Sequence, residues 1–127
     1  NSGLMECVGK AVHEAGGRTI GVVPRIMEEG RRVSGYVDVE IPCEDLNDRK
    51  AIMMERADVF HALPGGVGTL DEIFTVAASA SIGYHRKKIV LHNVKGFWNS
   101  LVDLLDDLQR HGMTRGDYHD SIEIKDA

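Results

Sequence analysis

The feature that most constrains the fold is a run in which a buried strand leads through a glycine-rich turn directly into a helix. Residues 59–63 read V-F-H-A-L, residues 64–68 read P-G-G-V-G, and T-L-D-E-I-F follows. The pattern predicts a strand over 59–63 and a helix from Thr69 to about Ala80. This order is typical of an open α/β sheet, in which ligands bind beyond the carboxyl ends of the strands.

Shorter patterns on either side continue the alternation of strands and helices. Apolar residues at helical spacing predict helices over 4–15, 47–56 and 98–108, the second capped by Asn47 or Asp48. Apolar runs predict strands over 19–23, 88–91 and 121–124, with a further short strand at 36–41. The alternation predicts an α/β fold with a mostly parallel sheet. A chain of 127 residues is expected to form one domain, residues 1–127.

Composition removes several classes of function. Fifteen Lys and Arg against twenty Asp and Glu leave a formal net charge of −5, which disfavours a nucleic-acid or anionic-membrane partner. No apolar run approaches the roughly 20 residues of a membrane-spanning helix. The two cysteines, Cys7 and Cys43, are far apart and show no metal-ligand spacing. We therefore expect a cytoplasmic protein without a disulfide scaffold or a bound metal.

The glycine turn predicts a phosphate site. Gly65, Gly66 and Gly68 allow the backbone to approach an anion closely and to take positive φ, and Thr69 adds a hydroxyl. The N-terminus of the following helix would present free N–H groups and a positive dipole end. The turn is neither a Walker A loop, because no Lys follows the glycines, nor a G-x-G-x-x-G motif.

Two charged residues near this turn each have two readings. Glu72 either closes a capping box with Thr69 or acts as a catalytic carboxylate, and spacing alone rates the two equally. A carboxylate beside a phosphate loop makes chemical sense if it faces developing positive charge, such as an oxocarbenium ion at a ribose C1′. Arg49 could clamp a phosphate, but on its own it is better read as a solvated helix charge.

A family resemblance bears on both residues. Residues 49–72, R-K-A-I-M-M-E-R-A-D-V-F-H-A-L-P-G-G-V-G-T-L-D-E, resemble the signature of the LONELY GUY family of cytokinin riboside 5′-monophosphate phosphoribohydrolases, long labelled possible lysine decarboxylases. Residues 2–24 and 87–101 are similar to the segments that flank this signature in the family. The resemblance implies a Rossmann-like fold and hydrolysis of a purine nucleoside 5′-monophosphate to free base and ribose 5-phosphate, without a cofactor.

The resemblance also implies roles for individual residues. Arg49 and Glu72 match the essential arginine and glutamate, which shifts Glu72 toward catalysis. The phosphate loop is matched by Gly65, Gly66, Gly68 and Thr69, and substrate contacts are expected from Lys50, Met53, Pro64 and Val67. The family further implies a homodimer, and small residues over 77–81 suit a subunit interface.

The chain departs from the family in ways that leave alternatives open. The family's first strand, helix and second strand are expected to precede residue 1, so the nucleotide site would be incomplete. Residues 78–83 read A-S-A-S-I-G where many members have T-W-A-Q-L-G, so adenine and a prenylated adenine remain equal candidates for the base. A non-catalytic nucleotide-binding module is the alternative function. A pyridoxal phosphate decarboxylase would need a Schiff-base lysine, and neither Lys50 nor Lys87-Lys88 lies in a suitable motif.

Overall fold

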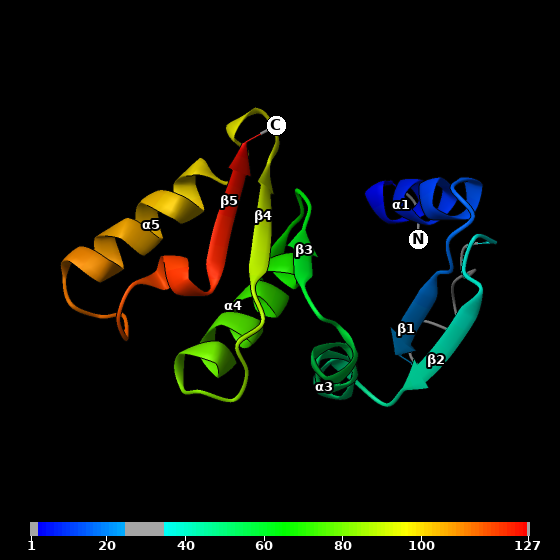
Figure 1. Ribbon diagram of the computed structural model, residues 1–127, viewed down its shortest axis with the longest axis horizontal. Helices are drawn as coiled ribbons and strands as arrows, with labels where there is room; N and C mark the ends of the chain where they lie inside the picture. The colour runs from blue at the N-terminus through cyan, green and yellow to red at the C-terminus, as the bar shows by residue number, and fades with distance from the viewer. Residues whose placement is uncertain (1–2, 25–34, 127) are drawn as a thin grey trace. The chain divides into compact units, whose positions relative to one another are not determined.

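The computed structural model describes residues 3–24 and 35–126 (Figure 1). The chain divides into two compact units, Asn1–Arg56 and Ala57–Ala127. Every strand pairing in the described residues is parallel, and helices flank the strands. The predicted α/β class with parallel, Rossmann-like sheets is therefore confirmed. The expectation of one domain over residues 1–127 stays a prediction.

The described residues of the first unit form two helices and a two-stranded sheet. Its elements are α1 (Leu4–Glu14), β1 (Ile20–Pro24), β2 (Val39–Cys43) and α3 (Leu46–Arg56). The two strands run parallel, with register partners from Ile20↔Val39 to Pro24↔Cys43. Helix α1 stops as predicted, because Gly16 takes a φ of +80° and its N–H donates to the carbonyl of His13.

Hydrogen bonds just before the two strands fix where they begin to pair. The Asp38 carboxylate accepts from the backbone N–H of Thr19 over 2.7 Å, and the Asp38 N–H donates to the Thr19 hydroxyl over 3.0 Å. These bonds hold the pKa of Asp38 below its usual value, mainly through the Thr19 N–H. The short strand expected at 36–41 is instead β2 at Val39–Cys43, because this exchange of bonds with Thr19 precedes the regular ladder.

The second unit contains a three-stranded parallel sheet. In chain order its elements are β3 (Phe60–Ala62), α4 (Val67–Ser81), β4 (Ile89–Asn93), η1 (Val94–Gly96), α5 (Asn99–Arg110), η2 (Tyr118–Asp120) and β5 (Ile122–Asp126). The strand order is β3-β4-β5, which places β4 in the middle. Each of the predicted segments in this unit is confirmed, with ends that differ by one or two residues.

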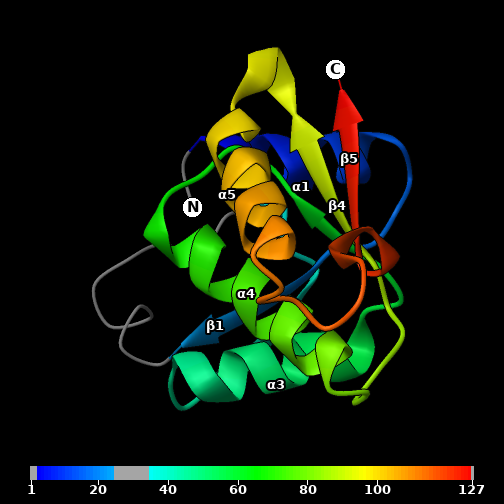
Figure 2. The same ribbon diagram turned by 90° about the vertical axis from the view of Figure 1, so that its left-hand side faces the viewer.

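The core of the second unit lies between its sheet and two helices. Figure 2 looks onto α4 and α5, with β4 and β5 behind them. Leu91 is fully buried, and Ile89 and Ile122, which are register partners, are 1% and 2% exposed. Apolar side chains of the helices complete the core, namely Ile73, Val76, Leu101 and Leu105. Burying such side chains supplies about 1.5–3 kcal/mol each, which makes this unit's core its main source of stability.

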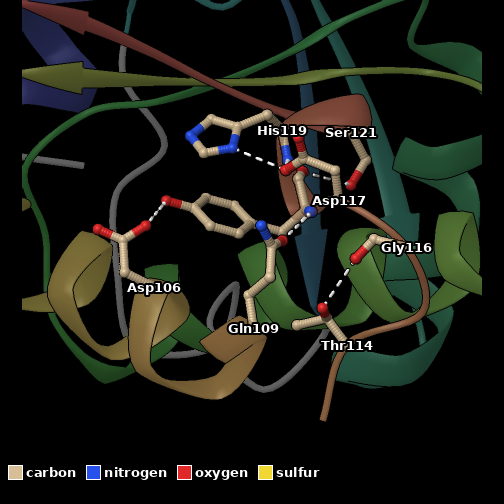
Figure 3. A network of polar contacts seen from close by, with 8 residues as sticks. Asp106, Gln109, Thr114, Gly116, Asp117, His119 and Ser121 are labelled. Carbon is tan, nitrogen blue, oxygen red and sulfur yellow. Dashed lines mark hydrogen bonds and ion pairs between the residues drawn. The ribbon is translucent and has the colours of Figure 1, made fainter. Parts of the chain in front are cut away.

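A polar network ties the end of α5 to the start of β5. Figure 3 shows Asp106 and Gln109 on α5 and the segment that runs from Asp117 to Ser121. The Tyr118 hydroxyl donates to the Asp106 carboxylate, and the Tyr118 N–H donates to Gln109 Oε1 over 2.8 Å. Burial and the Asp106 carboxylate raise the pKa of Tyr118 to about 12.

None of the helices in the described part of the chain has the length and apolar character needed to cross a membrane.

Candidate functional site

The candidate site is the turn between β3 and α4. Strand β3 ends at Ala62 and helix α4 begins at Val67, with Gly66 in the N-cap position at φ −102° and ψ −147°. The N-cap residue is a glycine and so has no side chain to cap the helix, and the first turn carries no acidic residue. Gly66, Val67 and Gly68 are exposed. The N–H groups of the first turn therefore face outward, at the positive end of a 15-residue helix, and are suited to bind an anion.

The start of α4 corrects the expected role of Thr69. Helix α4 begins two residues earlier than predicted, so Thr69 is the third helical residue and is not the N-cap. The capping box of Thr69 with Glu72 is therefore wrong. Thr69 is not the N-cap because Gly66 already takes that position. The Leu70 N–H donates to the Gly66 carbonyl over 3.1 Å, which is the first hydrogen bond of the helix.

Close approach, rather than positive φ, explains the first glycine of the turn. A Cβ on Gly65 would collide with the Thr69 hydroxyl and would lie 3.1 Å from the Thr69 Cβ. By contrast, a Cβ on Gly66 or Gly68 would meet no atom within 4 Å among the described residues. None of the three adopts the positive φ that their type permits. Gly65 is thus required for packing of the turn, while Gly66 and Gly68 leave the helix end uncovered.

The carboxyl end of β4 lies at the same edge of the sheet as this turn. Because Ala62 pairs with Leu91, the residues after each strand leave the sheet at the same level. Asn93, 5% exposed, ends β4. Its Oδ1 accepts from the Trp98 N–H over 2.7 Å, and its Nδ2 donates to Asn99 over 2.8 Å and to Asp126 over 3.2 Å. The sequence analysis missed this residue, whose signal is an amide side chain at the end of the apolar strand I-V-L-H-N.

Helix α3 carries the other predicted site residues. Its cap is Asp45 and not Asn47 or Asp48: Asp45 Oδ1 accepts from the Asp48 N–H over 2.8 Å. Asp48 in turn accepts from the Glu44 N–H over 2.9 Å, so the two carboxylates cap the helix together. This cap sets the first turn from which Arg49 projects.

The predicted site residues thus divide between the two units. Arg49, Lys50 and Met53 lie on α3 in the first unit and are half-buried. The second unit brings together Pro64, Gly65, Gly66, Val67, Gly68, Thr69 and Glu72 on one turn and one helix. Glu72 is half-buried and lies in the second turn of α4. One unit therefore supplies the glycine turn and a carboxylate together.

Comparisons with known proteins agree with the resemblance. The family described as possible lysine decarboxylase matches residues 5–127. The cytokinin riboside 5′-monophosphate phosphoribohydrolase LOG5 of Arabidopsis thaliana is 44% identical over 106 residues, which are 82% of this chain and 46% of that protein. The corresponding figures for LOG7 of the same plant are 43% over 105 residues, 82% and 48%.

A relative from rice has a similar sequence identity. The probable cytokinin riboside 5′-monophosphate phosphoribohydrolase LOGL2 of Oryza sativa subsp. japonica is 41% identical over 114 residues, which are 89% of this chain and 46% of that protein. The chain spans about half the length of the curated relatives it matches.

Proposed function

This chain belongs to the possible lysine decarboxylase family, the family of the LONELY GUY proteins, and from that premise we propose that it hydrolyses the N-glycosidic bond of a purine nucleoside 5′-monophosphate. The products are the free base and ribose 5-phosphate. The observation that carries the proposal is the N-terminus of α4, which begins at the glycine N-cap Gly66, with Glu72 in the same helix. That pairing offers an anion site to the phosphate of a nucleotide and a carboxylate to its ribose.

The phosphate is bound by the turn. The N–H groups of Gly66, Val67 and Gly68 and the hydroxyl of Thr69 donate to its oxygens, assisted by the dipole of α4. Gly65 and Pro64 shape the turn that carries these donors. The family resemblance gives Arg49 of α3 the role of an essential arginine that binds substrate, and Lys50 and Met53 of the same helix are further proposed substrate contacts.

Glu72 acts on the ribose. As the bond between C1′ and the base nitrogen breaks, its electron pair leaves with the base and C1′ gains oxocarbenium character. The Glu72 carboxylate stabilises that positive charge and accepts a proton from the water that adds to C1′. The departing base nitrogen takes up one proton, by way of solvent, which restores the Glu72 carboxylate and gives the free base. No redox step occurs, so the reaction needs no redox cofactor.

The identity of the base is part of the proposal. The curated relatives are named for cytokinin riboside 5′-monophosphate. Residues 78–83 of this chain, A-S-A-S-I-G, lie at the end of α4 and just beyond it, and they offer neither an aromatic ring nor an amide to a base. Adenine and N6-prenylated adenine are therefore both proposed as leaving bases, and the assay below separates them.

We further propose a cytoplasmic homodimer that uses one face of α4. Phe74 is 40% exposed, Ile82 is 53% exposed and Tyr84 is 80% exposed, so apolar side chains along and after this helix face outward. Exposed aromatic and aliphatic side chains are enriched at subunit interfaces, which supports this proposal. Light scattering on the purified protein is expected to give twice the chain mass of 14.0 kDa.

The activity is tested by following the free base. The purified protein is incubated with AMP and, separately, with N6-isopentenyl-AMP, without added cofactor, and free base and ribose 5-phosphate are separated by chromatography. Equal amounts of base and sugar phosphate from either substrate support the proposal and identify the substrate. Binding of both nucleotides without release would favour a nucleotide-binding module. An absorbance band on addition of pyridoxal phosphate, together with loss of CO₂ from an amino acid, would favour a decarboxylase.

A further inference from the structure

Two histidines lie side by side on neighbouring strands of the second unit. His61 is in β3 and pairs in register with Val90 of β4. His92 lies two residues farther along β4, so both imidazoles are on the same face of the sheet. His61 Nδ1 lies 2.9 Å from His92 Nε2, and the two rings stack with centroids 5.1 Å apart.

Two oppositely charged side chains of β5 share this face of the sheet with the histidine pair. Glu123 and Lys125 of β5 are the register partners of Val90 and His92, so their side chains share this face. One carboxylate and one ammonium cancel in formal charge, which leaves no net repulsion against a cation on the sheet. His61 is exposed and His92 is half-buried, so the pair is accessible from one side and anchored by the central strand on the other.

The two nitrogens are close enough for both to bind one metal ion. Two imidazole nitrogens that each lie about 2.0 Å from a metal are about 2.8 Å apart at a right angle and about 3.3 Å apart at a tetrahedral angle. The observed 2.9 Å is the ordinary length of the N–H···N hydrogen bond that joins the rings, and it lies within the range that two ligands of one ion span. Square-planar or tetragonal coordination by nitrogen is typical of Cu²⁺ and Ni²⁺. Imidazole is also a ligand type that these ions prefer.

We propose that His61 and His92 form a two-histidine chelate for Cu²⁺ or Ni²⁺ on this face of the sheet. In the present arrangement one ring donates a hydrogen bond to the other through a single N–H. On binding, the donor ring moves that proton to its other nitrogen, so both facing nitrogens present lone pairs and neither ring loses its proton. The described residues hold no group of three or more His, Cys, Asp or Glu side chains suited to a metal, so water fills the remaining positions.

The chelate would act on the strand that leads into the glycine turn. Strand β3 has only three residues and pairs with β4 alone among the described strands. An ion held by one ligand from each strand cross-links β3 to β4 and favours the folded state, because the unfolded chain does not hold the two imidazoles together. This inference depends only on the two rings and is independent of the proposed hydrolysis.

The test measures binding of the metal salts themselves. Untagged protein is titrated with CuCl₂ and with NiCl₂ by calorimetry at neutral pH, and thermal unfolding is recorded with and without each ion. We expect one equivalent to bind and the Tm to rise. The variants His61→Gln and His92→Gln should each bind at least about tenfold more weakly, since loss of a metal ligand costs no less than loss of a supporting residue. His111→Gln is the matched control, because His111 is an exposed histidine on another part of the unit.

Two results would overturn the assignment. One is a wild-type protein that binds neither ion. The other is binding that survives in both His61→Gln and His92→Gln, which would locate the ion elsewhere. Imidazole proton spectra guard against misfolded variants. In the wild type, Cu²⁺ should broaden the ring signals of His61 and His92 first, and earlier broadening of another histidine would also contradict the proposal.

Discussion

The Thr69 hydroxyl occupies the space that a Cβ on Gly65 would need. Gly65 thus lies against Thr69, the third residue of α4. The residues between them in the sequence are exposed. Glycine is therefore required at position 65 for a steric reason that involves one named side chain.

Substitution of this glycine should destabilise the protein, whereas substitution of a nearby one should not. Gly65→Ala forces the Thr69 side chain to move and is expected to cost about 1–3 kcal/mol, as other overpacked sites do. Gly68→Ala is the matched control, because its Cβ meets nothing within 4 Å among the described residues and alanine favours helix. That change should be neutral or should stabilise by up to about 1 kcal/mol. Urea unfolding followed by Trp98 fluorescence measures both. Equal stability of the two variants would contradict the steric explanation.

The buried amide of Asn93 should matter for stability more than its exposed partner. Asn93→Ala leaves the Trp98 N–H without its acceptor in a buried position, and we expect a loss of about 1–3 kcal/mol. Asn99→Ala removes only an exposed partner of the same amide, so its cost should stay below about 1 kcal/mol. Chemical denaturation of both variants gives the comparison. A smaller loss of unfolding free energy for Asn93→Ala than for Asn99→Ala would contradict a stabilising role for the hydrogen bond from the Trp98 N–H to Asn93 Oδ1.

The Tyr118 phenol should make the protein sensitive to alkali. Its pKa is about 12 in the folded chain, against about 10 for an ordinary tyrosine. Because the pKa is higher in the folded chain than in the unfolded chain, the neutral phenol contributes its full share to the free energy of unfolding below pH 10. That contribution is lost as the pH rises from about 10 to about 12.

Tyr118→Phe tests this linkage. The variant should lose about 1 kcal/mol at neutral pH, from the hydrogen bond to Asp106, and should show a smaller fall in stability above pH 10 than the wild type. Tyr84→Phe is the control, because Tyr84 is 80% exposed. The measurement is the free energy of unfolding at several values of pH from 7 to 12. Parallel curves for the wild type and Tyr118→Phe would refute the role of the phenol.

The order of elements could be predicted because each carries its own periodicity. The strand at 59–63, the turn and the following helix were all identified, as were the helix stop at Gly16 and the final strand. Helix starts were harder to predict, since they depend on backbone geometry and on side chains in the loops. Gly66 begins α4 without a side-chain cap, and Asp45 caps α3 where Asn47 or Asp48 was expected.

Contacts between distant residues could not be read from spacing. The amide of Asn93 meets Asp126, and His61 meets His92, only after β3, β4 and β5 pair. The network of Tyr118 depends in the same way on the approach of η2 to α5. The catalytic roles of Arg49 and Glu72 come from the family resemblance and remain predictions.

The most direct test of the proposed hydrolysis compares the wild type with Glu72→Gln in two measurements made on the same preparations. One is release of ribose 5-phosphate from AMP and from N6-isopentenyl-AMP, and the other is equilibrium binding of the same nucleotides. We expect Glu72→Gln to reduce turnover by about 10²–10⁴-fold, because it removes a charge and a proton acceptor, while nucleotide binding changes little. Turnover by Glu72→Gln equal to that of the wild type would contradict the assignment of Glu72 and the mechanism built on it.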